Sequence, residues 1–587
     1  MSSEVAGGEP GVADHRSMPG SVGAVGPVLA TFLIVAAAGS PAITVWASNI
    51  GQITKPHRLI LISGLWILLG ALLLWSARRI TPDARVAAFS TFFLMLALTS
   101  GGRLLGRVPW GWRWAATLLA ASTVIAVVMR LRGWWLLDVI VIGSAAALIV
   151  PPIMTGLWAA STNEPAADHR SFQATGLAMV HKPDIYLVIV DGYASLPVLE
   201  STFGFRDREL RADLGRSGFE MLEPAFSPYP MTHLAVSSLL ELDYVAPLRP
   251  ATTTLDGRTL GDVIGGQSRL VSMLADNGYH ITMVESGWHL SACGNRIDFC
   301  VESPFIDEGV DLVLSQSLIW SFLEPHVGSA FTHGARRSME WAASGLEVLS
   351  TNGNPDFAFV HVLAPHPPLF LDASCNVIDG SSRLRRGSLN TIGEDPTTAS
   401  ARADGYVEQV QCVNRFLRRL TQSLSSTDAL VFVTGDHGSN TLGQFETDPD
   451  DWSDAQIVER MSTLVAVKPT EGCDVPESSV TVAALRDLVS CAGGVDLGRL
   501  EERAFLLSLS GIRGDALGMR SLEAVQLRLL ATCLTSGAFP PEAHDDRPTA
   551  SDCGIATAHV STGEASLPLM RLPSYADHMS EWLANPA

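Results

Sequence analysis

Acidic and imidazole side chains recur where apolar segments of this 587-residue chain end. The segments VIVDG, HVLAPHPP and VTGDHG supply five of them, namely Asp191, His361, His366, Asp436 and His437. Carboxylates together with a neutral imidazole suit a divalent cation such as Mn²⁺ or Zn²⁺. A cation lowers the pKa of an adjacent hydroxyl group and makes it a nucleophile at neutral pH. These residue types therefore indicate a metal site that activates a hydroxyl.

Thr232 is the candidate for that hydroxyl. It lies in SPYPMTHLAVSSLLELDYV, where a proline-containing turn leads into a helical pattern of apolar residues. The start of a helix directs backbone N–H groups and the positive end of the helix dipole towards a bound anion. The alternative is that Thr232 only caps the helix, because threonine is favoured at that position.

Strand-like segments must bring these residues together. The runs DIYLVIVDG, YHITMVES, DFAFVHVLA and ALVFVTGDHG alternate with helix-length segments such as FRDRELRADLGRSGFEML. This alternation predicts an α/β domain around a mostly parallel central sheet. Ligands bind at the carboxyl ends of the strands in such a sheet. One aspartate at a strand end is more often a turn residue, but several at successive strand ends favour a joint site.

The N-terminal part of the chain has a different character. Five apolar runs, broken by short arginine-containing loops, are too many and too long for a signal peptide and are interpreted as membrane spans. The runs cover residues 24–47, 59–76, 86–100, 114–129 and 135–158. The formal net charge of −20 argues against nucleic acid as the main partner.

The cysteines suggest where the remaining part lies. All eight follow the last apolar run, at positions 293, 300, 375, 412, 473, 491, 533 and 553. An even set confined to one portion predicts disulfides and an oxidising, extracytoplasmic compartment, and Cys293 and Cys300 are close enough for a small closed loop. The alternative is a set of buried free thiols.

These patterns divide the chain into five parts. We interpret residues 1–22 as a disordered cytoplasmic tail, residues 23–160 as a transmembrane region of about five helices, and residues 161–183 as a linker. Residues 184–507 form the α/β domain, and residues 508–587 are a C-terminal extension without evident chemistry.

The order of the motifs resembles a known family. PDIYLVIVDGYAS, a threonine at a helix start, FVHVLAPHPP, FVTGDHG and VERMSTLVAV follow one another as in the alkaline phosphatase/sulfatase superfamily. The resemblance spans residues 184–505 and is closest to the membrane-anchored branch, which includes lipoteichoic acid synthases (phosphoglycerol transferases) and phosphoethanolamine transferases. It implies five N-terminal spans followed by an extracytoplasmic, sulfatase-like α/β sandwich domain.

The resemblance also implies roles for individual residues. Asp191, Thr232, Asp436 and His437 resemble metal ligands, and Thr232 would also be the nucleophile. His366 resembles the histidine that contacts the transferred phosphate or assists the leaving group. Substrate contacts are expected from Trp288, Arg296 and His361, although strand alternation buries His361. One divalent ion is expected, Mn²⁺ first, with Zn²⁺ or Mg²⁺ as alternatives.

Two departures narrow the expected activity. Sulfatases need a cysteine or serine in a CxPxR-type motif, whereas Thr232 is followed by HLAVS, so sulfate ester hydrolysis is disfavoured. Two-zinc members need a DxxxH pair, which we expect to be missing between Thr232 and Asp436.

The predicted activity is that of a membrane-anchored, metal-dependent transferase of the cell envelope. Its threonine would attack a phospholipid donor and move phosphoglycerol or phosphoethanolamine to an envelope glycan or lipid. The alternatives are an extracytoplasmic phosphodiesterase or sulfatase-like hydrolase, and a non-catalytic membrane protein that binds a glycan or a partner.

Overall fold

The computed structural model describes most of the chain, in segments. The described residues are 22–49, 53–81, 84–105, 134–161, 176–245, 254–255, 258–320, 330–349, 353–378, 396–441, 449–507, 519–523, 526–527 and 529–530. They fall into two compact units. One comprises Met1–Pro41 with Ser63–Val150, and the other comprises Ala42–Ile62 with Pro151–Ala587.

Long apolar helices make up the N-terminal part. They are α1 (Val22–Ser48), α2 (Pro56–Ile80), α3 (Ala84–Leu105) and α5 (Trp134–Ser161). Two stretches, Val28–Ala47 and Pro56–Ile80, are long and apolar enough to cross a membrane, whereas Val86–Ser100 and Val141–Met154 are shorter. The predicted span at residues 114–129 lies outside the described residues. Five spans therefore stay a prediction.

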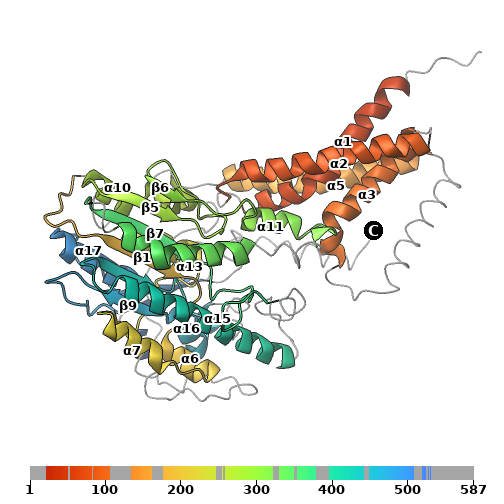
Figure 1. The fold of residues 1–587 in the computed structure, drawn as a ribbon. Coiled ribbons are helices and arrows are strands. Elements are labelled where there is room, and N and C mark those ends of the chain that lie inside the picture. Colours follow the sequence, from red (N-terminus) through yellow and green to blue (C-terminus); the bar gives the residue numbers. More distant parts are fainter. Residues whose placement is uncertain are drawn as a thin grey trace, which may run out of the picture. The chain divides into compact units, whose positions relative to one another are not determined.

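A seven-stranded sheet forms the centre of the second unit (Figure 1). Its strands are β1 (Ile185–Val190), β2 (Glu220–Met221), β5 (His280–Val284), β6 (Phe299–Val301), β7 (Asp356–Val362), β8 (Leu430–Thr434) and β9 (Val465–Lys468). Their order is β2-β9-β8-β1-β7-β5-β6. Strands β8, β1, β7, β5 and β6 pair in parallel, and β9 pairs antiparallel with both β8 and β2. The predicted mostly parallel sheet is confirmed.

The register of the central strands explains why their ends meet. Val190 of β1 lies beside Val362 of β7, and Ile189 lies beside Thr434 of β8. All six residues of β1 are buried, because the strand is covered on both faces. The polar residues that follow β1, β7 and β8 consequently emerge at one edge of the sheet.

Helices pack against this sheet in two groups of mutual contacts. The first consists of α6 (Leu196–Phe203), α7 (Arg208–Arg216), α13 (Ala330–Leu349) and α15 (Pro396–Ser423), and α13 contacts β7. The second consists of α8 (Thr232–Glu241), α10 (Arg269–Asp276) and α17 (Thr481–Gly493), which reach the sheet through β5 and β8. Two shorter helices, α11 (Glu308–Leu314) and α16 (Asp454–Met461), complete the surroundings of the site.

A hairpin carries the folded region past residue 507. Strand β10 (Arg503–Leu507) pairs antiparallel with β11 (Met519–Glu523), beyond the boundary expected from the sequence.

The cysteines of the described residues are all paired. The disulfides are Cys293–Cys300, Cys375–Cys412 and Cys473–Cys491, so the expectation of disulfides, including the small loop closed by the first pair, is confirmed. Cys533 and Cys553 lie outside the described residues.

Candidate active site

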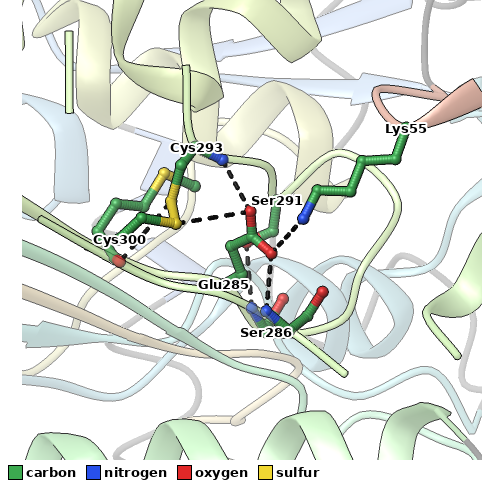
Figure 2. The surroundings of a disulfide bond; sticks show 8 residues. Lys55, Glu285, Ser286, Ser291, Cys293 and Cys300 are labelled. Carbon is green, nitrogen blue, oxygen red and sulfur yellow. Dashed lines mark hydrogen bonds and ion pairs between the residues drawn. A yellow bond between two sulfur atoms is a disulfide. The ribbon is translucent and has the colours of Figure 1, made fainter. Parts of the chain in front are cut away.

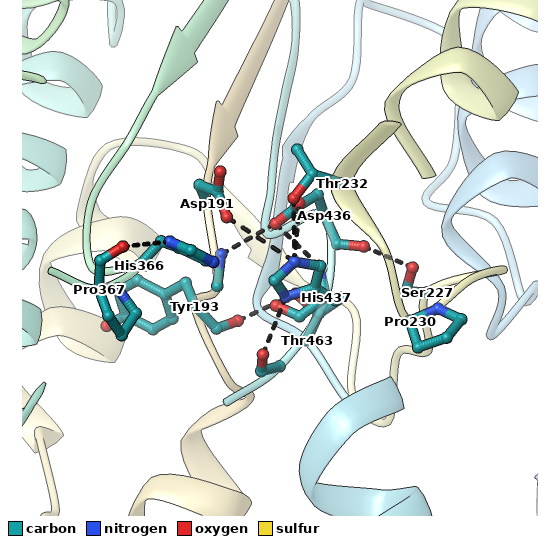
Figure 3. A network of polar contacts seen from close by, with 12 residues as sticks. Asp191, Tyr193, Ser227, Pro230, Thr232, His366, Pro367, Asp436, His437 and Thr463 are labelled. Atoms are coloured by element: carbon teal, nitrogen blue, oxygen red, sulfur yellow. Dashed lines mark hydrogen bonds and ion pairs between the residues drawn. The ribbon is translucent and has the colours of Figure 1, made fainter. Parts of the chain in front are cut away.

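Three adjacent strand ends supply the polar cluster that the sequence predicts (Figure 3). Asp191 directly follows β1, and its backbone N–H donates to the carbonyl of Val362 on β7 at 2.9 Å. Strand β8 ends at Thr434, and after Gly435 the chain continues with Asp436 and His437. All three functional side chains are buried. Because the carboxyl ends of adjacent parallel strands lie at one edge of the sheet, residues about 250 positions apart in the chain come together here.

One nitrogen atom lies at the centre of this cluster. The Nε2 atom of His437 is 3.1 Å from Oγ1 of Thr232, 3.2 Å from Oδ2 of Asp436 and 3.8 Å from Oδ1 of Asp191. The other ring nitrogen, Nδ1, is 2.9 Å from the carbonyl oxygen of Gly438 and must donate to it. Burial and the nearby Arg460 guanidinium hold the pKa of His437 well below its ordinary value, so the ring is neutral. Its Nε2 therefore presents a lone pair to two carboxylates.

The two carboxylates differ in their protonation. One oxygen of Asp436, Oδ1, accepts hydrogen bonds from the backbone N–H groups of Gly192 and His437, both at 2.9 Å. Burial and the negative charge of Asp191 nevertheless raise the pKa of Asp436 to about 6. Burial also opposes ionisation of Asp191, but the imidazoles of His366, His361 and His437 outweigh it and hold its pKa below the usual range.

The donor set fits a divalent cation. Oδ1 of Asp191 and Oδ2 of Asp436 are buried and accept no hydrogen bond from any described residue. Ligand atoms of Asp191, His366 and His437 all lie within 4.8 Å of one another. Oxygen and imidazole atoms that face each other without donors repel, and a bound cation removes both that repulsion and the cost of burying unpaired charge.

Thr232 is the first residue of α8, and Met231 occupies the N-cap position without a side-chain capping bond. The interpretation of Thr232 as a helix cap is therefore wrong. Its hydroxyl is directed at His437 instead, as Figure 3 shows. The N-terminus of α8 consequently faces the same cluster, where its dipole favours an anion such as a phosphate.

His366 lies within ligand distance of the cluster. The family resemblance implies a contact with the phosphate, whereas the His366 ring also lies with Asp191 and His437 as a possible ligand of one ion. Its Nδ1 is 2.5 Å from the carbonyl oxygen of Pro367 and donates to it, which leaves Nε2 as the available ring atom.

His361 is fully buried on β7, as strand alternation predicts. Its Nε2 lies 3.4 Å from Oδ2 of Asp191, and its Nδ1 lies 3.2 Å from the hydroxyl of Ser286. Trp288 packs edge-on against the same ring, with centroids 5.3 Å apart. His361 thus contacts Asp191, and Trp288 contacts His361. The expected contacts of both residues with substrate stay predictions.

The family of this domain follows from a comparison with family models. Residues 210–458 match the Sulfatase family model. The chain contains a sulfatase-family domain. This domain belongs to the alkaline phosphatase superfamily, and its matched residues include Thr232, His366, Asp436 and His437. No curated protein matches the sequence.

Solved structures with similarity to the chain include transferases and sulfatases. The integral membrane lipooligosaccharide phosphoethanolamine transferase A from Neisseria meningitidis is 14% identical, with 76% of this chain and 77% of that chain covered and a TM-score of 0.33. The periplasmic domain of EcEptC from Escherichia coli, in a complex with Zn, is 10% identical, with 57% and 87% covered and a TM-score of 0.34. BT33494S-sulf from Bacteroides thetaiotaomicron is 15% identical, with 59% and 85% covered and a TM-score of 0.35. The family assignment rests on the family model.

Arg296 is the one expected site residue that lies apart from the cluster. It is exposed, and its guanidinium donates to the hydroxyl of Ser272 on α10 at 3.3 Å. No contact between Arg296 and the cluster is present among the described residues, so its pairing with a phosphate stays a prediction without structural support.

One DxxxH spacing does occur between Thr232 and Asp436, at Asp276 and His280, so the expectation of none was wrong. His280 is the first residue of β5, and its ring is 3.1 Å from the carboxylate of Asp356 at the start of β7. Both lie at the amino end of parallel strands, opposite the edge that carries the cluster. Asp276 and His280 therefore supply no second metal site beside Thr232.

Arg460 is a functional candidate that sequence reasoning missed. It lies on α16 and is buried. Its guanidinium donates to the carbonyl of Pro230 at 2.8 Å and to that of Gly438 at 3.1 Å. It therefore ties the turn before Thr232 to the loop after His437. The signal in the sequence was an arginine shortly before the apolar run LVAV.

The sequence reasoning also missed a pair of titratable groups, His289 and Glu308. His289 donates from its ring and backbone to Glu308 at the start of α11. Burial alone would raise the pKa of Glu308, but the imidazoles of His289 and His366 lower it. His233, next to Thr232, has its pKa lowered to about 4 by burial and by His289. The polar site of the sulfatase-family domain therefore continues beyond the cluster around His437.

Gly192 offers a test of how tightly the site is packed. Its φ is +71°, and an added Cβ would lie 3.3 Å from Cα of His366. We expect Gly192→Ala to destabilise the fold by about 1–2 kcal/mol from the left-handed conformation, and to lower turnover about 100-fold by displacing His366. Thermal unfolding and initial rates measure the two effects.

Gly472→Ala is the matched control for this substitution. Gly472 has a φ of +84° but nothing within 4 Å of an added Cβ. It should lose similar stability and keep full turnover. Full turnover in Gly192→Ala as well would mean that the position of His366 does not limit the reaction.

Proposed function

We propose that this protein is a membrane-anchored, metal-dependent transferase with Thr232 as its nucleophile. Its donor would be a membrane phospholipid, from which phosphoglycerol or phosphoethanolamine passes to a glycan or lipid of the cell envelope. The observation that carries the proposal is the convergence of Thr232, Asp191 and Asp436 on the unprotonated Nε2 of His437. Such a set of electron-rich atoms, next to a hydroxyl at a helix start, suits the binding and attack of a phosphodiester.

The cation expected here would be held by Asp191, Thr232, Asp436 and His437. When bound, it would lower the pKa of the threonine hydroxyl and neutralise charge on the phosphate. Mn²⁺ is proposed first, with Zn²⁺ or Mg²⁺ as alternatives. The carbonyl of Gly438 fixes the His437 tautomer that a ligand role requires.

The proposed reaction has two displacements. Oγ1 of Thr232, whose proton has been released to solvent beforehand, attacks phosphorus in line as the alkoxide and regains that form in the second displacement. A phosphothreonine diester forms, and the P–O bond to diacylglycerol breaks. His366 donates a proton to the leaving oxygen from Nε2, because its Nδ1 is held by the carbonyl of Pro367. The acceptor hydroxyl then attacks the same phosphorus, loses its proton to His366 and releases Thr232.

Two further observations support the cellular setting. The stretches Val28–Ala47 and Pro56–Ile80 are apolar and long enough to cross a membrane. The three disulfides of the catalytic unit suit an oxidising, extracytoplasmic compartment. A site that acts on phospholipids would need such an attachment, whereas one that acts on soluble esters would not.

Hydrolysis is the second candidate function, because the match to the Sulfatase family model favours it. Water in place of the acceptor hydroxyl would make the protein a phosphodiesterase with the same residues. Sulfate ester cleavage is less well supported, since Thr232 stands where a cysteine or serine would be needed. Should neither reaction occur, binding of a glycan or a protein partner would remain.

The full-length protein in detergent with Mn²⁺ and fluorescent phosphatidylglycerol or phosphatidylethanolamine tests these alternatives. We expect diacylglycerol release from one of the two lipids, together with a mass gain on the protein that identifies the transferred group. Cleavage of a generic phosphodiester without turnover of either lipid would instead establish the hydrolase. Inactivity towards all three substrates would contradict the proposal.

A further inference from the structure

The segment Thr54–Arg58, at the start of α2, packs on the catalytic unit and is named here the N-terminal clamp. It belongs to the same compact unit as residues 151–587. Three of its four polar side chains, Thr54, Lys55 and Arg58, bond to residues between Glu285 and Asp307, more than 200 positions away. The clamp therefore contacts one continuous stretch of the chain, which joins β5 to α11.

Lys55 pairs with a buried carboxylate at the beginning of that stretch (Figure 2). Glu285 directly follows β5, is 1% exposed, and lies 2.5 Å from the Lys55 ammonium group. The backbone N–H groups of Cys293 and Ser303 also donate to it, at 2.9 and 2.8 Å. Among the described residues, Lys55 is the only cation paired with Glu285. Without it, a buried charge would lose its counterion.

The remaining contacts hold the end of the stretch. Arg58 donates to the side chain of Asp307 at 3.0 Å and to the carbonyls of Pro304 and Phe305 at 2.8 and 3.2 Å. Asp307 is the N-cap of α11, so this ion pair fixes the start of that helix. Thr54 donates from its hydroxyl to the carbonyl of His289 at 2.6 Å.

Catalytic positions depend on the residues that the clamp holds. Ser286, next to Glu285, accepts from the backbone N–H of Trp288, so its hydroxyl proton is available to Nδ1 of His361. That bond leaves the imidazole proton on Nε2, which faces Oδ2 of Asp191 at 3.4 Å. Asp191 Oδ1 is then directed towards His437. A continuous set of contacts thus runs from Lys55 to a proposed metal ligand.

We propose that the N-terminal clamp is a positioning element of the active site, with Lys55 as its main residue. By neutralising Glu285, Lys55 holds Ser286 where it orients His361 against Asp191. This inference rests on the proposed function, since it assigns Lys55 and Arg58 to the same reaction. It also makes the first residues of α2 part of the catalytic apparatus, because α2 begins within the clamp.

The test compares variants of the full-length protein in detergent, with a soluble phosphodiester and Mn²⁺. Lys55→Met should lower kcat about 10-fold or more with little change in KM, as loss of an outer-shell partner does, and Lys55→Arg should restore it. Arg79→Met is the control, because Arg79 lies at the other end of α2 and contacts the ring of Trp75. Unchanged kcat in Lys55→Met, or no rescue by Lys55→Arg, would overturn the proposal.

A second variant covers the case in which Lys55→Met does not fold. The double variant Lys55→Met/Glu285→Gln buries no unpaired charge and should keep the wild-type unfolding temperature. Reduced kcat and weaker Mn²⁺ binding in this folded protein would support positioning, whereas wild-type values of both would overturn it. If the wild type itself shows no Thr232-dependent turnover, the proposed function fails. The Mn²⁺ affinity of the same variants then still decides whether the clamp orders the ligands.

Discussion

Thr232→Ala is expected to abolish turnover of every phosphodiester substrate and to remove the covalent mass gain on the protein. The hydroxyl of Thr232 is the only group on α8 directed at His437 among the described contacts. Loss of a nucleophile lowers kcat by roughly 10⁴- to 10⁶-fold. Steady-state rates and intact-mass analysis during turnover measure the two effects.

Ser237→Ala is the matched control for this substitution. Ser237 lies on the same helix, is buried, and its hydroxyl has no partner among the described residues. It should therefore keep wild-type rates. Thr232→Ser should keep part of the activity because it retains the hydroxyl. A Thr232→Ala protein that still forms the adduct would place the nucleophile elsewhere.

Removal of the metal is the second change that is expected to abolish activity. Chelation by EDTA should abolish turnover, and Mn²⁺ should restore it and raise the unfolding temperature. The pKa of Asp436 is raised to about 6 in the folded protein, above the ordinary value for an aspartate of about 3.9. The metal-free protein therefore holds a proton on this carboxyl up to about pH 6. The stability that this proton contributes is lost as the pH rises from about 3.9 to about 6, and it does not change further above that range.

A cation must displace that proton. Its apparent affinity should consequently fall about 10-fold per pH unit below pH 6 and level off above it. Asp191 has the opposite sign, since its lowered pKa contributes stability above the unfolded value that is lost on acidification. Calorimetric titration with Mn²⁺ between pH 5 and 8 measures the slope.

Asp436→Asn is the informative variant for this measurement. It should bind the ion weakly and lose the pH dependence, because no proton competes with the ion at that position. An affinity for Mn²⁺ that is unchanged in Asp436→Asn, or that does not vary below pH 6 in the wild type, would contradict the assignment of Asp436 as a ligand.

The sequence predicted the part of the site that depends on strand ends. Asp191 follows an apolar run directly, and Asp436 and His437 follow another within four residues. A parallel sheet necessarily gathers such positions at one edge. Thr232 could be found because a helix start that follows a proline-containing turn has a recognisable pattern. The mostly parallel sheet followed from the alternation of strands and helices.

The sequence could not predict contacts that depend on tertiary packing. Arg460 reaches the carbonyls of Pro230 and Gly438 across the fold, and nothing in its own segment indicates those partners. Lys55 resembled an ordinary loop charge between apolar runs, because its partner Glu285 is 230 positions away. The DxxxH spacing at Asp276 and His280 was missed, and the spacing alone could not have shown which end of the sheet these residues occupy.

The position of β1 between β7 and β8 has a consequence for the dynamics of the protein. Every backbone amide of this strand is enclosed by pairing on both sides and by buried side chains on both faces. Such amides exchange with solvent hydrogen only when the whole domain opens. Hydrogen–deuterium exchange of residues 185–190 should therefore report the global free energy of unfolding, while exchange in the stretch 285–307 reports local opening. The two can be followed separately in one protein sample.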